Sequence, residues 1–512
     1  MNSIKDRAAL IAAAAKEMGK EVYNDSNKKK DTTPRHELQR QSTKVVTLEE
    51  AIRRSGLKDG MTISFHHHFR GGDKVINMVV AKLAEMGFKN LSLASSSLID
   101  VHEPLIEHIK NGVITELQTS GLRGALATEV SHGLMEKPVI FRSHGSRGSA
   151  IVSGELKIDV AFLGASSSDP LGNACGYSRS ENAKSICGSL GYALPDAKYA
   201  KHTVILTDDL VDYPNTPNSI SEADVESVVV VDSVGDSSKI SSGAIRDTKN
   251  PRDILLAKQA AKVVENSGYF QDGFSLQTGS GGASLAVTKY LRQGMIDRGI
   301  KASFALGGIT SHMVKLHEEG LIERLVDVQS FDKVAAESLK NDPMHKEATA
   351  NEYASAQEAG SATHFLDVVI LSALEVDVNF NVNVLVGSDG IIRGAIGGHP
   401  DTAEDSALSV IVCPLLRGRI PCVVDEVTTH ITPGSNVDVV VTEYGIAVNP
   451  GRPEIKERLV AAGLNIVDIR DLAAKARSII GDPAPLPFGD KVVGIVMNRD
   501  GSVQDVIKNI VG

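Results

Sequence analysis

The sequence predicts an α/β protein built from two tandem, duplicated domains with mostly parallel sheets, preceded by a short N-terminal helical arm. Two observations lead to this prediction. Short runs rich in Val, Ile and Leu alternate with longer amphipathic stretches, a pattern typical of strand–helix units and parallel sheets. The second half of the chain also repeats the first at an interval of about 210 residues, which indicates a duplication.

The N-terminal region is expected to lie outside the folded body. The apolar run 8–15 predicts a short helix, and the polar, charged segment 22–44 predicts an exposed connecting arm. That apolar run is far shorter than the ~20 residues that cross a bilayer, and Lys16 and Glu17 follow it without a small-residue cleavage pattern. We therefore expect a cytoplasmic protein whose folded body begins near Val45.

Six apolar runs are the best candidates for buried strands of the body. Each is short, bounded by polar or turn-forming residues and rich in Val, Ile or Leu. They are 159–163, 203–206, 227–231, 367–371, 409–412 and 437–441.

The repeat can be followed along the chain. Segment 64–94 is similar in sequence to 275–306, and 159–173 is similar to 367–381. In the latter pair both copies place a second Asp ten residues, and an Asn fourteen residues, after the first Asp. A Pro-Asp dipeptide extends the match. The implied parts are the arm at 1–44, a first domain at 45–248 and a second domain at 249–512.

Composition narrows the classes of ligand. The 512 residues carry 54 Lys and Arg against 64 Asp and Glu, a net charge of −10, so no basic field is available for nucleic acid. Aromatic residues make up only 4%, without Trp, which argues against base-stacking platforms. The four cysteines form no CxxC pair, and we expect buried free thiols.

One glycine-rich turn stands where ligands bind in such folds, after an apolar strand and before a helix at 283–292. Its backbone N–H groups suit an oxyanion or a phosphate, although such a turn is also often only a tight turn. The candidate residues are Gln277, Gly279, Ser280, Gly281 and Gly282.

The equivalent turn of the first half adds positive charge. We expect Arg70, with His66 and His68, to bind a polycarboxylate, because a planar guanidinium grips a carboxylate with two hydrogen bonds. The alternative is a plain surface loop. Adjacent histidines of an extended segment point to opposite faces, and no carboxylate spacing accompanies them, so we expect no metal site.

Two further segments of the second half are candidates for the site. Glu375 follows a buried strand and has no counterpart in the first half, whereas Asn381 and Asn383 belong to a stretch that also suits a side-chain-closed turn. A second glycine-dense loop contains Gly397 and Gly398. The dinucleotide, P-loop and serine-hydrolase motifs are missing from the sequence, and we expect no tightly bound cofactor.

These residues together resemble the CoA-transferase superfamily, whose subunits are duplicated α/β units. A DVAxxxAxxxDxxGN element matches 159–173, and an ALxVDxxGN element matches 373–381 except at Phe380, which stands in place of the Gly. Long stretches such as QTGSGGASLAVTKYL and RGAIGGHPDTAEDS resemble, more closely, the family of bacterial citrate lyase alpha subunits. The resemblance covers about 40–510 and implies CoA-transferase-like domains.

One departure from the superfamily bears on mechanism. Other members carry a nucleophilic Glu shortly after the glycine turn, and it forms a covalent enzyme–CoA thioester. Here the matching position is Leu306, followed by Gly307 and Gly308, and a leucine cannot act as a nucleophile. Glu181, in a similar-looking string, follows the wrong strand of the wrong repeat, and we interpret it as a surface residue.

The resemblance implies a transferase that exchanges the acetyl group of an acetyl thioester for citrate, directly and through a mixed anhydride. The implied donor is the phosphoribosyl-dephospho-CoA group of an acyl carrier protein subunit, or acetyl-CoA, and the products are a citryl thioester and acetate. The implied partners are that carrier and a citryl lyase subunit, with neither nucleic acid nor membrane. The glycine loops would then stabilise the oxyanion.

Two other hypotheses remain open. The chain is a conventional CoA-transferase or thioesterase with Glu375 as the nucleophile, or it is a non-catalytic CoA-sensing scaffold. Covalent trapping separates the first alternative from direct transfer, and turnover by the purified chain separates the second.

Overall fold

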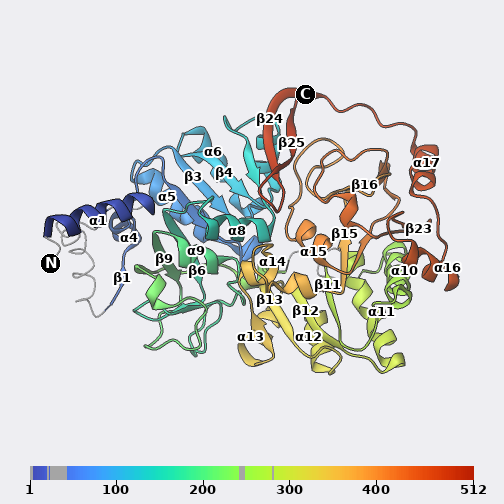
Figure 1. Ribbon diagram of the computed structural model, residues 1–512, viewed down its shortest axis with the longest axis horizontal. Helices are drawn as coiled ribbons and strands as arrows, with labels where there is room; N and C mark the ends of the chain where they lie inside the picture. The colour runs from blue at the N-terminus through green and yellow to red at the C-terminus, as the bar shows by residue number, and fades with distance from the viewer. Residues whose placement is uncertain (1–3, 20–21, 23–42, 242–247, 280–281, 512) are drawn as a thin grey trace. The chain divides into compact units, whose positions relative to one another are not determined.

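The computed structural model describes residues 4–19, 22, 43–241, 248–279 and 282–511, in two compact units, 1–44 and 45–512. The first unit contains α1 (Ile4–Glu17), the N-terminal helix that the apolar run predicts. The expected connecting arm falls almost entirely outside the described residues. The second unit contains two large sheets (Figure 1).

The first sheet has ten strands and is parallel apart from its last hairpin. In spatial order the strands are β1 (Val45–Val46), β10 (Ser227–Val230), β9 (His202–Thr207), β6 (Val160–Ala165), β2 (Thr62–Phe65), β3 (Leu91–Ser95), β4 (Ile114–Thr119), β5 (Val139–Phe141), β24 (Phe488–Met497) and β25 (Val503–Ile510).

The second sheet has eight strands and is parallel apart from its last strand. In spatial order they are β14 (His345–Glu347), β13 (Leu325–Ser330), β12 (Ala302–Ile309), β11 (Phe274–Thr278), β15 (Val368–Ser372), β18 (Leu408–Val412), β22 (Val439–Thr442) and β23 (Gly445–Val448). The six predicted strands are confirmed, with ends shifted by one or two residues, as β6, β9, β10, β15, β18 and β22.

The two sheets share one strand order. Seven strands of the first run β10-β9-β6-β2-β3-β4-β5, and seven of the second run β22-β18-β15-β11-β12-β13-β14. Matched positions make matched bonds: Asp159 accepts from the Thr62 N–H at 2.9 Å, and Asp367 accepts from the Ser275 N–H at 2.8 Å. The α/β class with mostly parallel sheets is therefore confirmed, and the repeat has a counterpart in strand order.

Helices connect the strands, as parallel pairing requires. Those of the first half are α4 (Leu48–Arg54), α5 (Val75–Glu85), α6 (Leu105–Lys110), α7 (Gly124–Ser131), α8 (His144–Ser153) and α9 (Ala193–Tyr199). Those that follow are α10 (Pro251–Ser267), α11 (Gly282–Arg298), α12 (Ser311–Glu318), α13 (Lys333–Asn341), α14 (Ala350–Ala354), α15 (His399–Asp405), α16 (Pro453–Ala461) and α17 (Ile469–Ile480). Within the described residues, none of these helices is long and apolar enough to cross a membrane.

Small sheets carry some of the loops after the main strands. They are β7 (Ser167–Ser168) with β8 (Ala174–Cys175), β19 (Leu416–Arg417) with β20 (Ile420–Pro421), and β17 (Val382–Asn383), β16 (Glu375–Asp377) and β21 (Val423–Val424) in one sheet of three. The four cysteines are free and buried, as expected.

The C-terminal hairpin differs from the predicted division at residue 249. β24 pairs with β5 in parallel register, through Gly494 opposite Val139, so the last strands of the chain extend the first sheet. In Figure 1 this hairpin, in red, lies beside the strands of the first half. β24 thereby covers the edge of β5, which would otherwise be exposed. No local sequence pattern predicts this pairing.

Candidate active site

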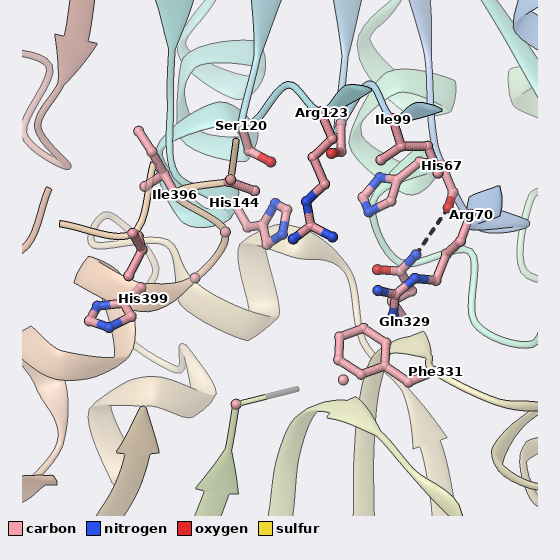
Figure 2. Close-up of a pocket in the computed structure, with 18 of the residues that line it drawn as sticks. His67, Arg70, Ile99, Ser120, Arg123, His144, Gln329, Phe331, Ile396 and His399 are labelled. Atoms are coloured by element: carbon pink, nitrogen blue, oxygen red, sulfur yellow. Dashed lines mark hydrogen bonds between the residues drawn. The ribbon is translucent and has the colours of Figure 1, made fainter. Parts of the chain in front are cut away.

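A cavity of about 720 Å³ lies where the carboxyl ends of strands from both sheets meet (Figure 2). His67, Ser97 and Ser120 follow strands β2, β3 and β4 of the first sheet and line it. Gln277, Gly308 and Gln329 line it from strands β11, β12 and β13 of the second sheet. The Gln329 amide donates to the His67 carbonyl oxygen at 3.1 Å, which joins the two walls. The cavity thus occupies the place expected for a ligand in this class of fold.

Among the described residues, four arginines line the cavity: Arg393 pairs with Asp389, Arg417 donates to backbone carbonyl oxygens, and Arg70 and Arg123 approach from the first half. Arg70 has a positive φ of 50°, and its guanidinium lies 4.6 Å from the centre of the Phe331 ring. Burial, and then the nearby charge of Arg123, lowers the pKa of Arg70 to about 10. Figure 2 shows the Arg123 side chain between His144 and Arg70, and Arg123 makes no ion pair with a carboxylate of the described residues. Two like charges around one space favour a ligand with more than one negative charge.

Of the three adjacent histidines, one lines the cavity and two are buried in the core. His66 and His68 are buried away from the cavity, with ring centres 3.8 Å apart, and His66 Nε2 bonds to the Gly164 carbonyl oxygen at 3.1 Å. The middle residue, His67, lines the cavity, and its Nδ1 lies 2.6 Å from Ser96 Oγ. Burial holds the pKa of His67 well below its usual range, so the ring is neutral.

His144 also faces the cavity and begins helix α8. Its ring lies 4.1 Å from the ring centre of Tyr192, which in turn packs 5.8 Å from that of His67. Burial, and then the charge of Arg147, lowers the pKa of His144 to about 3, so this imidazole is also neutral. Its Nδ1 atom is buried and has no hydrogen-bond partner among the described residues. A neutral imidazole here offers a hydrogen bond without adding charge.

The loop before α15 reaches across to the first sheet. The Ile396 N–H donates to the Ser120 carbonyl oxygen at 2.7 Å, and the His144 N–H donates to that of Gly397 at 2.9 Å. Gly397 has a φ of +59°, and a Cβ on Gly398 would lie 2.2 Å from the Tyr353 hydroxyl oxygen, so both positions require glycine. The N–H groups of Gly397 and Gly398 make no bond to another described residue, which leaves two adjacent donors at the cavity.

The turn after β11, unlike the Gly397–Gly398 loop, has its Gly279 N–H already hydrogen-bonded within the protein. Gln277 and Gly279 line the cavity, but the Gly279 N–H already donates to the Ile370 carbonyl oxygen at 2.7 Å. Gln277 Nε2 donates to the Tyr353 hydroxyl at 3.0 Å, while its Oε1 has no partner in the described chain. Gly282 begins α11 and does not line the cavity, and Ser280 and Gly281 lie outside the described residues.

The remaining glycine candidates serve close packing. A Cβ on Gly307, whose φ is +99°, would lie 2.8 Å from Gln277 Cδ, and one on Gly308 would lie 2.2 Å from the Phe331 ring. Gly308 lines the cavity and Gly307 does not. Leu306, which the sequence resemblance predicts to match the superfamily's nucleophile, is fully buried in the core.

The structure places Glu375, Asn381 and Asn383 away from the cavity. Glu375 is buried and accepts hydrogen bonds from Asn383 Nδ2 at 2.8 Å, from the Thr428 N–H at 2.8 Å and from Thr428 Oγ1 at 3.0 Å. Asn381 donates to Asp377 at 3.0 Å and accepts from the Gly434 N–H at 2.8 Å. These side chains are occupied in closing turns.

Several cavity residues carry no sequence signal that would have singled them out. Tyr192, Gln329, Phe331 and Tyr353 lie in ordinary amphipathic or strand-end contexts. Among the described residues that line the cavity, Asp100 is the one carboxylate.

Comparisons with known proteins show which family the chain belongs to. The family model of the citrate lyase alpha subunit (CitF) matches residues 42–510. The citrate lyase alpha chain of Klebsiella pneumoniae is 60% identical over 464 residues, 91% of each chain. A solved structure from Streptococcus mutans, named as an alpha subunit of citrate lyase in complex with citrate, is 55% identical with a TM-score of 0.90 over 92% of each chain.

A more distant solved structure is similar in fold. The 4-hydroxybutyrate CoA-transferase of Porphyromonas gingivalis is 18% identical, with a TM-score of 0.55 over 87% of this chain and 98% of its own. That likeness confirms the CoA-transferase-like fold.

Proposed function

The chain belongs to the family of citrate lyase alpha subunits, and from that premise we propose that its cavity exchanges an acetyl group for citrate by direct transfer between two bound substrates. Members of this family are transferase subunits of a multi-subunit citrate lyase complex. Direct transfer requires that both substrates occupy the cavity together, with the attacking oxygen of one against the carbonyl carbon of the other.

The proposed exchange has two steps. One carboxylate oxygen of citrate bonds to the carbonyl carbon of the acetyl thioester, and the carbon–sulfur bond breaks to give a mixed anhydride and a thiolate. The thiolate then attacks the citryl carbonyl carbon, and the carbon–oxygen bond of the anhydride breaks. Acetate leaves with an oxygen that came from citrate, and a citryl thioester remains.

The observation that carries this proposal is the shortage of a protein nucleophile. The resemblance predicts Leu306 at the superfamily's glutamate position, and Glu375 lies outside the cavity with both oxygens hydrogen-bonded. Among the described residues, Asp100 is the one carboxylate that lines the cavity, and it does so from the first half of the chain, as Arg70 and Arg123 do. A substrate oxygen is therefore the better candidate for the attacking atom.

The cavity offers what such a reaction needs instead. Arg70 and Arg123 suit the carboxylates of citrate, because guanidinium groups bind carboxylates with two hydrogen bonds. The adjacent N–H groups of Gly397 and Gly398 suit the oxygen that becomes negative on the carbonyl carbon. Holding two reactants in the right orientation is worth roughly 7–11 kcal/mol, which makes catalysis without a protein nucleophile feasible.

The partners are also part of the proposal. We infer that the donor is the acetylated phosphoribosyl-dephospho-CoA group of an acyl carrier protein subunit, with acetyl-CoA as a substitute, and that a citryl lyase subunit takes the product. The cavity volume of about 720 Å³ suits a small acid together with the end of a thioester arm. The citrate in the Streptococcus mutans structure supports the choice of acid.

Covalent trapping tests direct transfer. The purified chain is incubated with acetyl-CoA, reduced with borohydride, digested and analysed by mass spectrometry, with and without citrate. Direct transfer predicts citryl-CoA and acetate without a reduced carboxylate on the protein. If samples trapped at successive times contain reduced Glu375 or Asp100, in a yield that rises and falls at the rate of turnover, the conventional mechanism is established instead. A folded chain that turns over neither acetyl-CoA nor the acetylated carrier would support the scaffold hypothesis.

A further inference from the structure

The turn of the C-terminal hairpin carries an arginine that is buried between elements of both halves. Arg499 lies between β24 and β25, and its side chain is 3% exposed. Its guanidinium donates to the two carboxylate oxygens of Asp405 at 2.6 Å each and to the Ala354 carbonyl oxygen at 3.1 Å. Because β24 extends the first sheet while Asp405 ends α15 of the second half, Arg499 joins the two halves.

A second acid of α15 connects this arginine to the cavity. Asp401 lies 3.9 Å from Arg499 Nε, and it accepts from Ser143 Oγ at 2.5 Å and from the Gly145 N–H at 2.9 Å. Ser143 is the N-cap of α8, whose first residue, His144, faces the cavity. Helix α15 itself follows the Gly397–Gly398 pair directly. Arg499 itself does not line the cavity. It contacts α15, which follows the Gly397–Gly398 pair and binds the start of α8 beside His144.

Charge explains why a cation is needed at this point. Asp401 and Asp405 lie one helical turn apart and are largely withdrawn from water, so they repel each other unless a positive group stands between them. The groups that face Asp401 are Arg499 of the hairpin, Asp405 of its own helix, and the phenols of Tyr353 and Tyr192, besides the two donors of α8. Of these, Arg499 alone is a cation. Burial raises the pKa of Asp401 to about 6 even though Arg499 lowers it.

We propose that Arg499 is a positioning residue of the transfer site, which holds α15 against the start of α8 and thereby keeps the Gly397–Gly398 amides and His144 in the arrangement that transfer requires. The inference rests on the proposed function, because it assigns those groups to the transfer reaction. It gives the C-terminal hairpin a part in catalysis, although the hairpin lies at the far edge of the first sheet in strand order.

Substitution of Arg499 tests the proposal in the full chain. For Arg499→Gln we expect kcat of citrate-dependent transfer to fall by about 10- to 100-fold, because misplacement of catalytic groups by about 1 Å costs this much. The affinity for citrate, measured by calorimetry, should stay at the wild-type value, since Arg70 and Arg123 are untouched. The acid limb of the pH profile should move to higher pH, because Asp401 loses its cation. Arg499→Lys keeps a cation but loses the two-pronged contact, so its acid limb should stay in place while kcat still falls.

A matched control is available on the surface. Arg477 is exposed on α17 and ion-paired with Asp425, and Arg477→Gln should leave kcat, citrate affinity and pH profile unchanged. If Arg499→Gln lowers only the melting temperature, with wild-type kcat and pH profile in the folded enzyme, the proposal is overturned. If Arg499→Gln does not fold, an unchanged kcat in Arg499→Lys overturns it equally. The proposed function fails by a separate result, a trapped adduct on the wild-type chain.

Discussion

The Asp401 carboxylate accepts a 2.5 Å hydrogen bond from the Ser143 hydroxyl, 258 residues away in sequence. Asp196, which occupies the matching Pro-Asp dipeptide of the first half, pairs with Arg147 of the same helix α8 through two bonds of 2.7 and 2.8 Å. Asp401 and Asp196 thus both bind residues at the start of α8, and His144, the first residue of α8, lines the cavity. The two acids at matching positions of the predicted repeat therefore both bind the start of α8, on one side of the cavity.

The arginine pair should control the requirement for citrate. We expect Arg70→Ala and Arg123→Ala each to raise the citrate KM by about 10- to 100-fold, since a hydrogen bond to a charged group is worth ~1.5–3 kcal/mol. The acetyl-CoA KM should change much less. Steady-state kinetics with both substrates varied provides the measurement. Arg419→Ala, which removes an exposed arginine that does not line the cavity, is the control. Equal effects on both substrates would count against this assignment.

The glycine pair should control the rate rather than the affinity. A Cβ at Gly398 would meet the Tyr353 hydroxyl at 2.2 Å, so Gly398→Ala must change the spacing between Tyr353 and the loop that carries the two N–H donors. We expect kcat to fall by about 10- to 100-fold, with unchanged citrate binding by calorimetry, because displaced donors no longer match the oxyanion. Gly360→Ala places a methyl group in open space on an exposed loop and should behave as wild type. A Gly398→Ala enzyme with normal kcat would remove these amides from the mechanism.

The pH profile should report Asp401 and not a histidine. With a pKa of about 6, Asp401 is ionised above pH 6 and neutral below it, so its attraction to Arg499 and its bonds to α8 weaken as the pH falls. Transfer activity should therefore decline as the pH is lowered through about 6. The pKa of His144 is about 3 and that of His399 about 4, so neither ring titrates in this window. Asp401→Asn should flatten the limb and His144→Gln should retain it, and the opposite pattern would contradict the assignment.

Glu375 should matter for stability and not for transfer. Glu375→Gln turns one acceptor oxygen into a donor opposite Asn383 or Thr428, so we expect the free energy of unfolding to fall by about 1–3 kcal/mol. Turnover per folded enzyme should remain close to wild type. Denaturant unfolding, followed by kinetics on the folded fraction, gives both quantities. Loss of turnover at unchanged stability would revive Glu375 as a nucleophile.

Much of the fold was predictable because local patterns and the repeat agreed. Apolar runs marked the central strands, and the repeat marked which strands are equivalent. The pairing of β24 with β5 was not predictable, because it joins segments about 350 residues apart and depends on an edge that exists only after folding. Parallel partners of this kind leave no local signature.

The site was predictable in place but only partly in its residues. Strand alternation separates His67 from His66 and His68, but alternation alone does not say which side faces a ligand. The structure turns His66 and His68 toward the core and His67 toward the cavity. Likewise, an Asp and an Asn at fixed spacing serve a turn or a ligand equally well in sequence, and hydrogen bonds such as that from Asn381 to Asp377 show the turn.

Oxygen tracing in a single turnover tests direct transfer most directly. Enzyme in excess over acetyl thioester is mixed with citrate that carries ¹⁸O in its carboxylates, and the acetate released in the first turnover is analysed by mass spectrometry. Direct attack by citrate predicts one ¹⁸O atom in that acetate, because the oxygen that bonds to the acetyl carbon leaves with it. Unlabelled acetate, with ¹⁸O found instead on a carboxylate of the protein, would contradict the account.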